Sequence, residues 1–193
     1  MAGPKVVVYG LSTEGYAIAS QMAIKGADVY IIDESTPSAI SLKAEIAKTY
    51  PNVSSLKEDE PLLAMEPIDV AISKAQYLFF TPRIRKTGQD IKTEIHSKFK
   101  DAVTSLKKNS SVIFTLATGF GGNNENISLL EHVTGLQAGK NISYFYYPLE
   151  DLNQQPKIIG SFNGKEDSVL SDLLTTGKKE KNFVAISSSE HFH

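Results

Sequence analysis

Short apolar runs alternate with amphipathic stretches along most of the chain. The apolar runs predict strands at residues 6–9, 29–32, 77–80, 112–116, 142–147 and 157–160. Stretches with helical periodicity predict helices at residues 14–25, 37–50, 90–107, 124–134 and 165–175. Strands that are apolar throughout are typical of a parallel sheet covered by helices on both faces, because neither face meets water. The pattern therefore predicts an α/β fold with a doubly wound, mostly parallel sheet.

Residues that favour helix ends support two of these helices. Ser35 or Thr36 could cap the helix at 37–50, with Pro37 in its first turn. Gly135 is suited to end the helix that precedes it, because glycine readily adopts the left-handed conformation found there.

The pattern weakens in two parts of the chain. Residues 51–75 predict only short helical turns or a short strand. Near the C-terminus a charged run at 178–181 precedes a short apolar segment at 183–186, which could be a docked edge strand. We expect one dinucleotide-binding domain over residues 1–176 and a partly mobile extension over residues 177–193.

The first 33 residues combine a strand, a glycine turn, a helix and a second strand that ends on an acid. This is the order of the βαβ unit that binds dinucleotides, in which the helix N-terminus receives a pyrophosphate. Gly10 allows a tight reversal, Gly15 allows the helix to lie close to the strand, and Asp33 could accept hydrogen bonds from a ribose. The sequence thus predicts a Rossmann-like fold. Its candidate cofactor turn consists of Gly10, Leu11, Ser12, Thr13, Glu14 and Gly15.

Ser12 stands where the G-x-G-x-x-G pattern has its middle glycine. A Cβ and a hydroxyl at this place crowd the approach of a pyrophosphate, although the hydroxyl could instead donate a hydrogen bond to a phosphate. The alternative is a Rossmann-like unit that packs well and binds nothing. Both interpretations stay open from the residues alone.

Composition narrows the possible classes of protein. The chain has 193 residues, is 41% hydrophobic and carries a formal net charge of −2, so no global field attracts nucleic acid or an anionic membrane. It has no cysteine, which excludes disulfides, thiolate metal ligands and a cysteine nucleophile. His96 and His132 have no partners at metal-ligand spacing, and His191 and His193 either pair around a metal or simply end a polar tail. With no apolar run of membrane-spanning length and no signal peptide, we expect a cytoplasmic protein without a metal site.

Later motifs extend the likeness beyond the first βαβ unit. They are Phe79-Phe-Thr-Pro82, the segment 111–125 containing Ala117-Thr118 and Gly122, the segment 135–150 ending in Tyr-Tyr-Pro-Leu-Glu, and Pro156-Lys-Ile-Ile-Gly160. Their order resembles the NAD-binding N-terminal domain of the UDP-glucose/GDP-mannose dehydrogenase family over about residues 5–175. That family has a Thr-Pro after a central strand, a Ser-Thr-Val-x-x-Gly-Thr turn and a Pro-Glu pair in the same order.

The resemblance implies a set of cofactor-binding residues. They are Gly10, Leu11, Ser12, Thr13, Glu14, Gly15, Asp33, Thr81, Pro82, Ala117 and Thr118. The family usually has a basic residue soon after the ribose-binding acid, whereas Glu34, Ser35 and Thr36 follow Asp33 here. With no cation in place for a 2′-phosphate, we expect NAD rather than NADP as the cofactor.

The resemblance also shows what this chain lacks. Leu149 falls where the family has its glutamate, and Glu150 follows one residue later; a shift in the loop could restore the carboxylate. Thr118 and Glu150 are the two weak candidates for a catalytic role. The family's catalytic helix and cysteine-bearing loop follow this domain, and we expect a chain truncated before them. Without a cysteine, oxidation through a thiohemiacetal has no nucleophile.

Two loops at the predicted carboxyl edge of the sheet are further candidates. Arg83, Arg85 and Lys86 form a basic loop that either is solvated or holds a phosphate or a nucleotide-sugar diphosphate. The Gly119 turn opens a helix and either binds an anion or only connects two elements.

Three functions fit these observations. The first is a stand-alone NAD-binding domain whose ligand is a dinucleotide or a nucleotide sugar. The second is an NAD-dependent oxidoreductase subunit that receives catalytic groups from a partner protein or from a second copy in a homo-oligomer. The third is a degenerate fold kept as an interaction module. The sequence favours the first.

Overall fold

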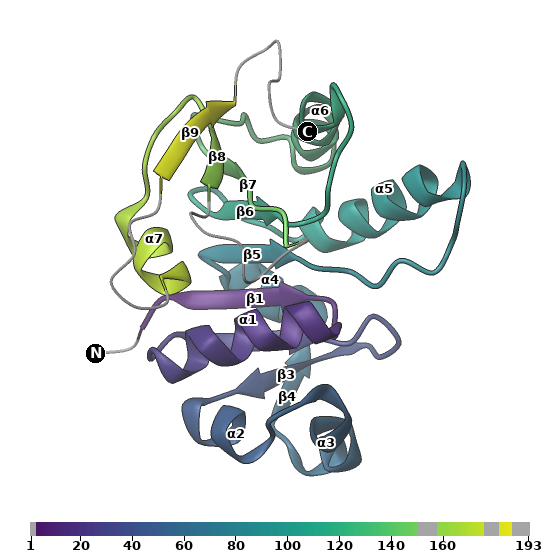
Figure 1. The fold of residues 1–193 in the computed structure, drawn as a ribbon, viewed down its shortest axis with the longest axis vertical. Helices are drawn as coiled ribbons and strands as arrows, with labels where there is room; N and C mark the ends of the chain where they lie inside the picture. The colour runs from purple at the N-terminus through teal and green to yellow at the C-terminus, as the bar shows by residue number, and fades with distance from the viewer. Residues whose placement is uncertain (1–2, 150–157, 176–181, 187–193) are drawn as a thin grey trace.

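A single mixed sheet organises the computed structural model, which describes residues 3–149, 158–175 and 182–186. Within these ranges the strand order is β4-β3-β2-β1-β5-β6-β7-β8-β9 (Figure 1). The strands are β1 (Lys5–Tyr9), β2 (Asp28–Ile32), β3 (Ser38–Leu42), β4 (Met65–Pro67), β5 (Tyr77–Phe80), β6 (Ser111–Phe114), β7 (Ser143–Tyr146), β8 (Ile158–Phe162) and β9 (Asn182–Ile186). The helices are α1 (Thr13–Ile24), α2 (Ala44–Thr49), α3 (Val53–Glu58), the 3₁₀ turn η1 (Glu60–Leu62), α4 (Ile68–Lys74), α5 (Asp90–Val103), α6 (Gly122–Thr134) and α7 (Ser168–Leu174).

The centre of the sheet is parallel, as the apolar strands predict. β1 pairs in parallel with β2 on one side and with β5 on the other, and β5, β6 and β7 continue in the same direction. The chain therefore leaves β1 towards one side of the sheet and later returns to its other side, at β5. This reversal of strand order creates the crevice where open α/β sheets bind their ligands, at the carboxyl ends of the strands.

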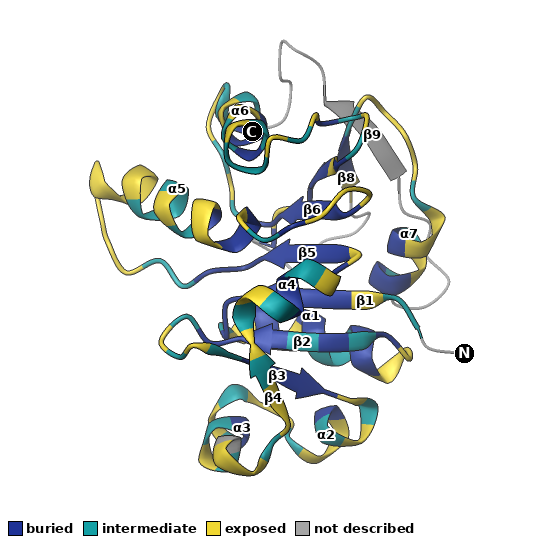
Figure 2. Ribbon diagram, turned by 180° about the vertical axis from the view of Figure 1, so that it is seen from behind, coloured by how far each residue is buried: buried dark blue, intermediate teal, exposed yellow. Residues whose placement is uncertain are grey.

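Helices cover both faces of the sheet, and alternate strand residues point to each. Val6 and Val8 pack with α1 and α7 in one core, whereas Val7 and Tyr9 pack with α4, α5 and α6 in the other. Figure 1 shows α1 in front of β1, and Figure 2 shows α4 in front of it when the molecule is seen from behind. The central strands in Figure 2 are buried almost throughout. The expected doubly wound α/β fold is confirmed.

The predicted helix at 37–50 is wrong in its first half. Ser38–Leu42 forms strand β3, antiparallel to β2, and only α2 remains helical. Residues 39–42 are all buried, which a helix on the sheet surface would not allow because one of its sides faces water. Ser35 and Thr36 do not cap a helix either; both make hydrogen bonds to Asp33 in the turn between the two strands.

Other expectations at the borders of elements are confirmed. Gly135 ends α6 in the left-handed conformation, with φ of +70°. Residues 182–186 pair in parallel with β8 as edge strand β9. The stretch 51–75, left open by the sequence, contains α3, η1, β4 and α4. Among the described residues, no helix combines the length and the apolar character needed to cross a membrane.

Candidate nucleotide-binding site

The turn between β1 and α1 is built on two glycines that are packed against the end of β5. Gly10 has a φ of +120°, and a Cβ placed on it would lie 2.1 Å from the carbonyl oxygen of Thr81. A Cβ on Gly15 would lie 2.5 Å from the carbonyl oxygen of Gly10 and 2.6 Å from the hydroxyl of Thr81. No side chain fits at either position. The structure therefore supplies the tight reversal and the close helix approach that the glycine spacing predicts.

Ser12 caps the N-terminus of α1. Its Oγ accepts a hydrogen bond from the backbone N–H of Gly15 at 3.0 Å and donates one to the carbonyl oxygen of Thr81 at 3.2 Å. The Ser12 hydroxyl, which the sequence suggests as a donor to a phosphate, thus donates its hydrogen bond to Thr81 at the end of β5 instead. Serine is among the best N-cap residues because its oxygen satisfies an N–H group that the helix leaves unpaired.

Substitutions at Ser12 should separate capping from crowding. Ser12→Ala removes the cap and is expected to lower the free energy of unfolding by about 1 kcal/mol, whereas Ser12→Gly should cost only a few tenths. Ser12→Gly also restores the glycine pattern, so we expect it to bind dinucleotide at least as tightly as the wild type. Urea denaturation and calorimetric titration of both variants measure the two effects. Weaker binding by Ser12→Gly would mean that the hydroxyl contacts the ligand.

A cleft of about 290 Å³ lies at the carboxyl ends of β1, β5 and β6. Five of the sequence-predicted residues line it: Ser12, Glu14, Thr81, Pro82 and Ala117. Thr81 is buried there, and its hydroxyl donates to the backbone carbonyl oxygens of Tyr9 and Gly10. This cleft occupies the crevice of the parallel sheet and has the free end of α1 at its wall, which is the geometry that receives a pyrophosphate.

Other predicted residues lie around the cleft without lining it. The side chain of Leu11 is only 1% exposed and belongs to the core, so that only its backbone faces the turn. Thr13 is exposed in the first turn of α1. Thr118 follows β6 and donates its backbone N–H to the Tyr146 hydroxyl at 3.2 Å. The Thr118 hydroxyl is buried and has no partner within the described part of the chain.

Asp33 directly follows β2, at the place the sequence predicts, but most of its carboxylate is bound by neighbouring groups. It is 6% exposed, and Oδ1 accepts hydrogen bonds from the N–H of Ser35 at 3.0 Å and from its hydroxyl at 2.7 Å. Oδ2 forms an ion pair with Lys57 at 3.3 Å. Burial alone would raise the pKa of Asp33, but the hydrogen bonds from Ser35 and the ion pair with Lys57 lower it below the ordinary value. The group is therefore a carboxylate at neutral pH.

Lys57 is the residue that sequence reasoning missed. It comes from α3, in the stretch where the hydrophobic pattern gave no clear prediction. Strand β3 runs antiparallel to β2, and the chain later returns through α3 to place this cation beside the Asp33 carboxylate. The only signal in the sequence was a lysine at a distance of 24 residues, which no short motif records.

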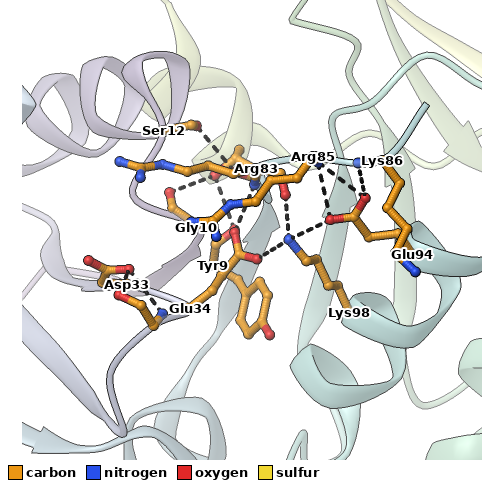
Figure 3. A network of polar contacts seen from close by, with 12 residues as sticks. Tyr9, Gly10, Ser12, Asp33, Glu34, Arg83, Arg85, Lys86, Glu94 and Lys98 are labelled. Atoms are coloured by element: carbon orange, nitrogen blue, oxygen red, sulfur yellow. Dashed lines mark hydrogen bonds and ion pairs between the residues drawn. The ribbon is translucent and has the colours of Figure 1, made fainter. Parts of the chain in front are cut away.

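The basic loop after β5 is held by carboxylates. Glu94 of α5 accepts hydrogen bonds from the backbone N–H groups of Arg85 and Lys86 (Figure 3). Lys98 forms ion pairs with Glu34 at 2.6 Å and with Glu94 at 3.2 Å. The backbone N–H of Lys86 is the largest influence that lowers the pKa of Glu94, so this carboxylate stays ionised. The loop is thus anchored directly after Pro82, which lines the cleft described above.

A second cavity of about 600 Å³ lies between α5 and α6, next to the same sheet edge. Ala117 lines both cavities. The Gly119 turn borders the second one and opens α6, with Gly121 as its N-cap at a φ of +78°. On the rim, Lys92 forms an ion pair with Glu125 at 2.7 Å.

Of the two weak catalytic candidates, only Thr118 lies in the described part of the chain. Leu149 lines the 290 Å³ cleft and is 9% exposed, so it contributes an apolar side chain to the wall. Glu150 lies outside the described residues. Within residues 3–149, 158–175 and 182–186 there is no cluster of three or more histidine, aspartate or glutamate side chains that could hold a metal. His96 only approaches Glu125, at 3.8 Å.

This arrangement defines an α/β protein with a Rossmann-like fold and a cleft at the carboxyl edge of its sheet, and solved structures share the fold. GDP-mannose dehydrogenase from Pseudomonas aeruginosa matches 96% of this chain at 13% identity with a TM-score of 0.67. UDP-D-ManNAc dehydrogenase from Pyrococcus horikoshii matches 95% at 18% identity with a TM-score of 0.64. An imine reductase from Aspergillus terreus, solved in complex with NADPH4, matches 96% at 12% identity with a TM-score of 0.57.

These likenesses establish the fold. This chain spans 47% of the length of each of the two sugar dehydrogenases and 56% of the imine reductase. No family model matches the sequence, and no curated protein is significantly similar to it. The nucleotide-sugar dehydrogenases named by the sequence resemblance are thus recovered independently, as structural neighbours.

Proposed function

We propose that this chain is a nicotinamide-dinucleotide-binding domain that prefers NAD and lacks complete dehydrogenase chemistry of its own. The main support for this proposal is the 290 Å³ cleft. Ser12, Thr81 and Ala117 line it at the carboxyl ends of the parallel strands, where the strand order reverses. The named cofactor-binding residues are Gly10 to Gly15, Asp33, Thr81, Pro82, Ala117 and Thr118. In this proposal residues 1–176 contain the site and residues 177–193 extend the domain.

The direct test is binding. Isothermal titration of the purified chain with NAD, NADH, NADP, NADPH and UDP-glucose should give saturable binding of the nicotinamide dinucleotides, with NAD tighter than NADP. A chain that binds none of these ligands at millimolar concentration would contradict the proposal. That result would favour the degenerate interaction module. Two contacts within the chain agree with this alternative: the Ser12 hydroxyl donates to Thr81, and the Asp33 carboxylate pairs with Lys57.

The preference for NAD rests on the Asp33 carboxylate, which repels a 2′-phosphate. Lys57 neutralises part of this charge but stays bound to Asp33 at 3.3 Å. A 2′-phosphate would have to separate this pair, whereas a ribose hydroxyl could donate to the same carboxylate without separating it. We expect the difference to be about ten- to a hundredfold in affinity.

Asp33→Asn should reverse this preference or remove it. The variant keeps the size of the side chain, removes the negative charge and frees Lys57 to meet a 2′-phosphate. We expect weaker binding of NAD and tighter binding of NADP, measured by titration. In Lys57→Met, which leaves Asp33 unneutralised, the preference for NAD should grow. If Asp33→Asn keeps the wild-type ratio of the two affinities, Asp33 does not face the ribose.

A second candidate function is an oxidoreductase subunit that receives catalytic groups from a partner chain or a second copy. The cavity between α5 and α6 favours it, since it adjoins the proposed cofactor cleft through Ala117 and has room for a substrate. Under this function the chain would transfer hydride only after the partner is added.

A further inference from the structure

One arginine reaches from the loop after β5 to the turn after β1. The Nη2 group of Arg83 donates a hydrogen bond to the carbonyl oxygen of Leu11, between Gly10 and Ser12. These two loops are neighbours because β1 and β5 pair in parallel. We propose that Arg83 binds the diphosphate group of the ligand in this cleft, a role that rests on the proposed nucleotide function.

The backbone around Arg83 is held independently of its side chain. Glu34 accepts a hydrogen bond from the Arg83 N–H at 2.7 Å, and Lys98 donates one to the Arg83 carbonyl oxygen. Lys98 is fixed in turn by its ion pairs with Glu34 and Glu94. The loop therefore presents the guanidinium to the turn without relying on a ligand, which lowers the ordering cost of binding.

The charges of the network leave the guanidinium available. Glu34 and Glu94 are directed to Lys98 and to backbone N–H groups. Within the described residues, the Arg83 guanidinium forms no ion pair with a carboxylate, and its hydrogen bond is to a neutral carbonyl. A guanidinium has five N–H donors, so several remain for an anion. The network thus holds the cation in place without neutralising it.

The position of Arg83 matches a diphosphate better than other groups of a nucleotide. Its partner carbonyl lies in the turn that precedes the N-terminus of α1, where phosphates bind in this kind of fold. Arginine makes paired, charge-assisted hydrogen bonds to phosphate oxygens, which are stronger than a hydrogen bond to a neutral carbonyl. Exchanging the Leu11 carbonyl for a phosphate is therefore favourable. The shared chemistry of the ligands is a diphosphate ester such as ADP or NAD.

The test compares ligands with and without phosphates. Calorimetric titration with ADP and NAD and NMR titration with adenosine are applied to the wild type, Arg83→Gln and Arg83→Lys. We expect Arg83→Gln to weaken ADP and NAD by about ten- to a hundredfold and to leave adenosine unchanged. Arg83→Lys keeps the charge and should lose less than Arg83→Gln. Melting temperatures confirm that each variant is folded.

Lys86→Gln is the matched control, because it removes one positive charge from the same loop. Figure 3 shows the Lys86 side chain beside Glu94, away from the Gly10 turn, so its affinities should stay within twofold of the wild type. Equal ADP affinity in Arg83→Gln and the wild type, or an equal loss in Lys86→Gln, would overturn the role of Arg83. A wild type that binds ADP but not NAD would contradict dinucleotide binding, and weaker ADP binding by Arg83→Gln would still support the role of Arg83. Binding of neither would contradict both.

Discussion

Gly10→Ala is expected to lower the free energy of unfolding by about 3–5 kcal/mol, more than an alanine at any other position in the turn between β1 and α1. Two costs combine. The φ of +120° is unfavourable for any residue with a Cβ, and that Cβ would lie 2.1 Å from the Thr81 carbonyl oxygen and 2.8 Å from the Cα of Pro82. Both neighbours are backbone at the end of β5, so relief requires the central parallel pair to move apart. Urea denaturation followed by circular dichroism measures the loss.

Gly26→Ala separates the two costs. Gly26 also has a positive φ, of +96°, but nothing lies within 4 Å of the position of an added Cβ. This variant carries only the conformational penalty and should lose about 1–2 kcal/mol. If the two variants lose equal stability, the contact between the first turn and β5 is looser than the structure has it. Dinucleotide binding by a folded Gly10→Ala variant at wild-type affinity would contradict a role for this turn in the site.

The sequence predicts those helices and strands that depend on residues close to one another along the chain. The β1-α1-β2 unit could be located from apolar runs, two glycines and a terminal acid, because each of these acts within a few residues of its place. Gly10 and Gly15 have the close neighbours that their spacing implies. The same reasoning failed at β3, because a short buried segment such as 38–42 has no periodicity that separates a strand from a helix.

The contacts that tune the site are long-range, and they could not be predicted. Lys57 meets Asp33 only because β3 reverses the chain, and Lys98 of α5 meets Glu34 from a distant part of the sequence, with β3, β4 and β5 between them. The sequence placed Arg83 in a basic loop at the sheet edge, but its contact with Leu11 depends on the pairing of β1 with β5. Motifs identify which residues face a ligand, whereas the packing of distant segments decides which of their groups remain available to it.

The purified chain is expected not to oxidise UDP-glucose or a similar nucleotide sugar to its acid. This oxidation removes two hydrides in succession, and in the resembling family the intermediate aldehyde is held by a cysteine as a thiohemiacetal. The 193 residues contain no cysteine, and Leu149 contributes an apolar side chain to the wall of the cleft. Loss of a covalent nucleophile typically lowers a rate by several orders of magnitude, so we expect no steady formation of NADH above background.

The assay needs high protein concentration, hours of observation and each common nucleotide sugar, with NAD binding verified on the same preparation. A complete nucleotide-sugar dehydrogenase in the same buffer serves as the positive control. Steady production of two NADH per sugar by this chain alone would contradict the binding-domain proposal. Activity that appears only after a partner protein is added would instead support the oxidoreductase subunit, because the catalytic groups would then come from that partner. Arg83→Gln should then reduce the rate at low NAD and recover at saturating NAD, as expected of a residue that binds the cofactor without taking part in hydride transfer.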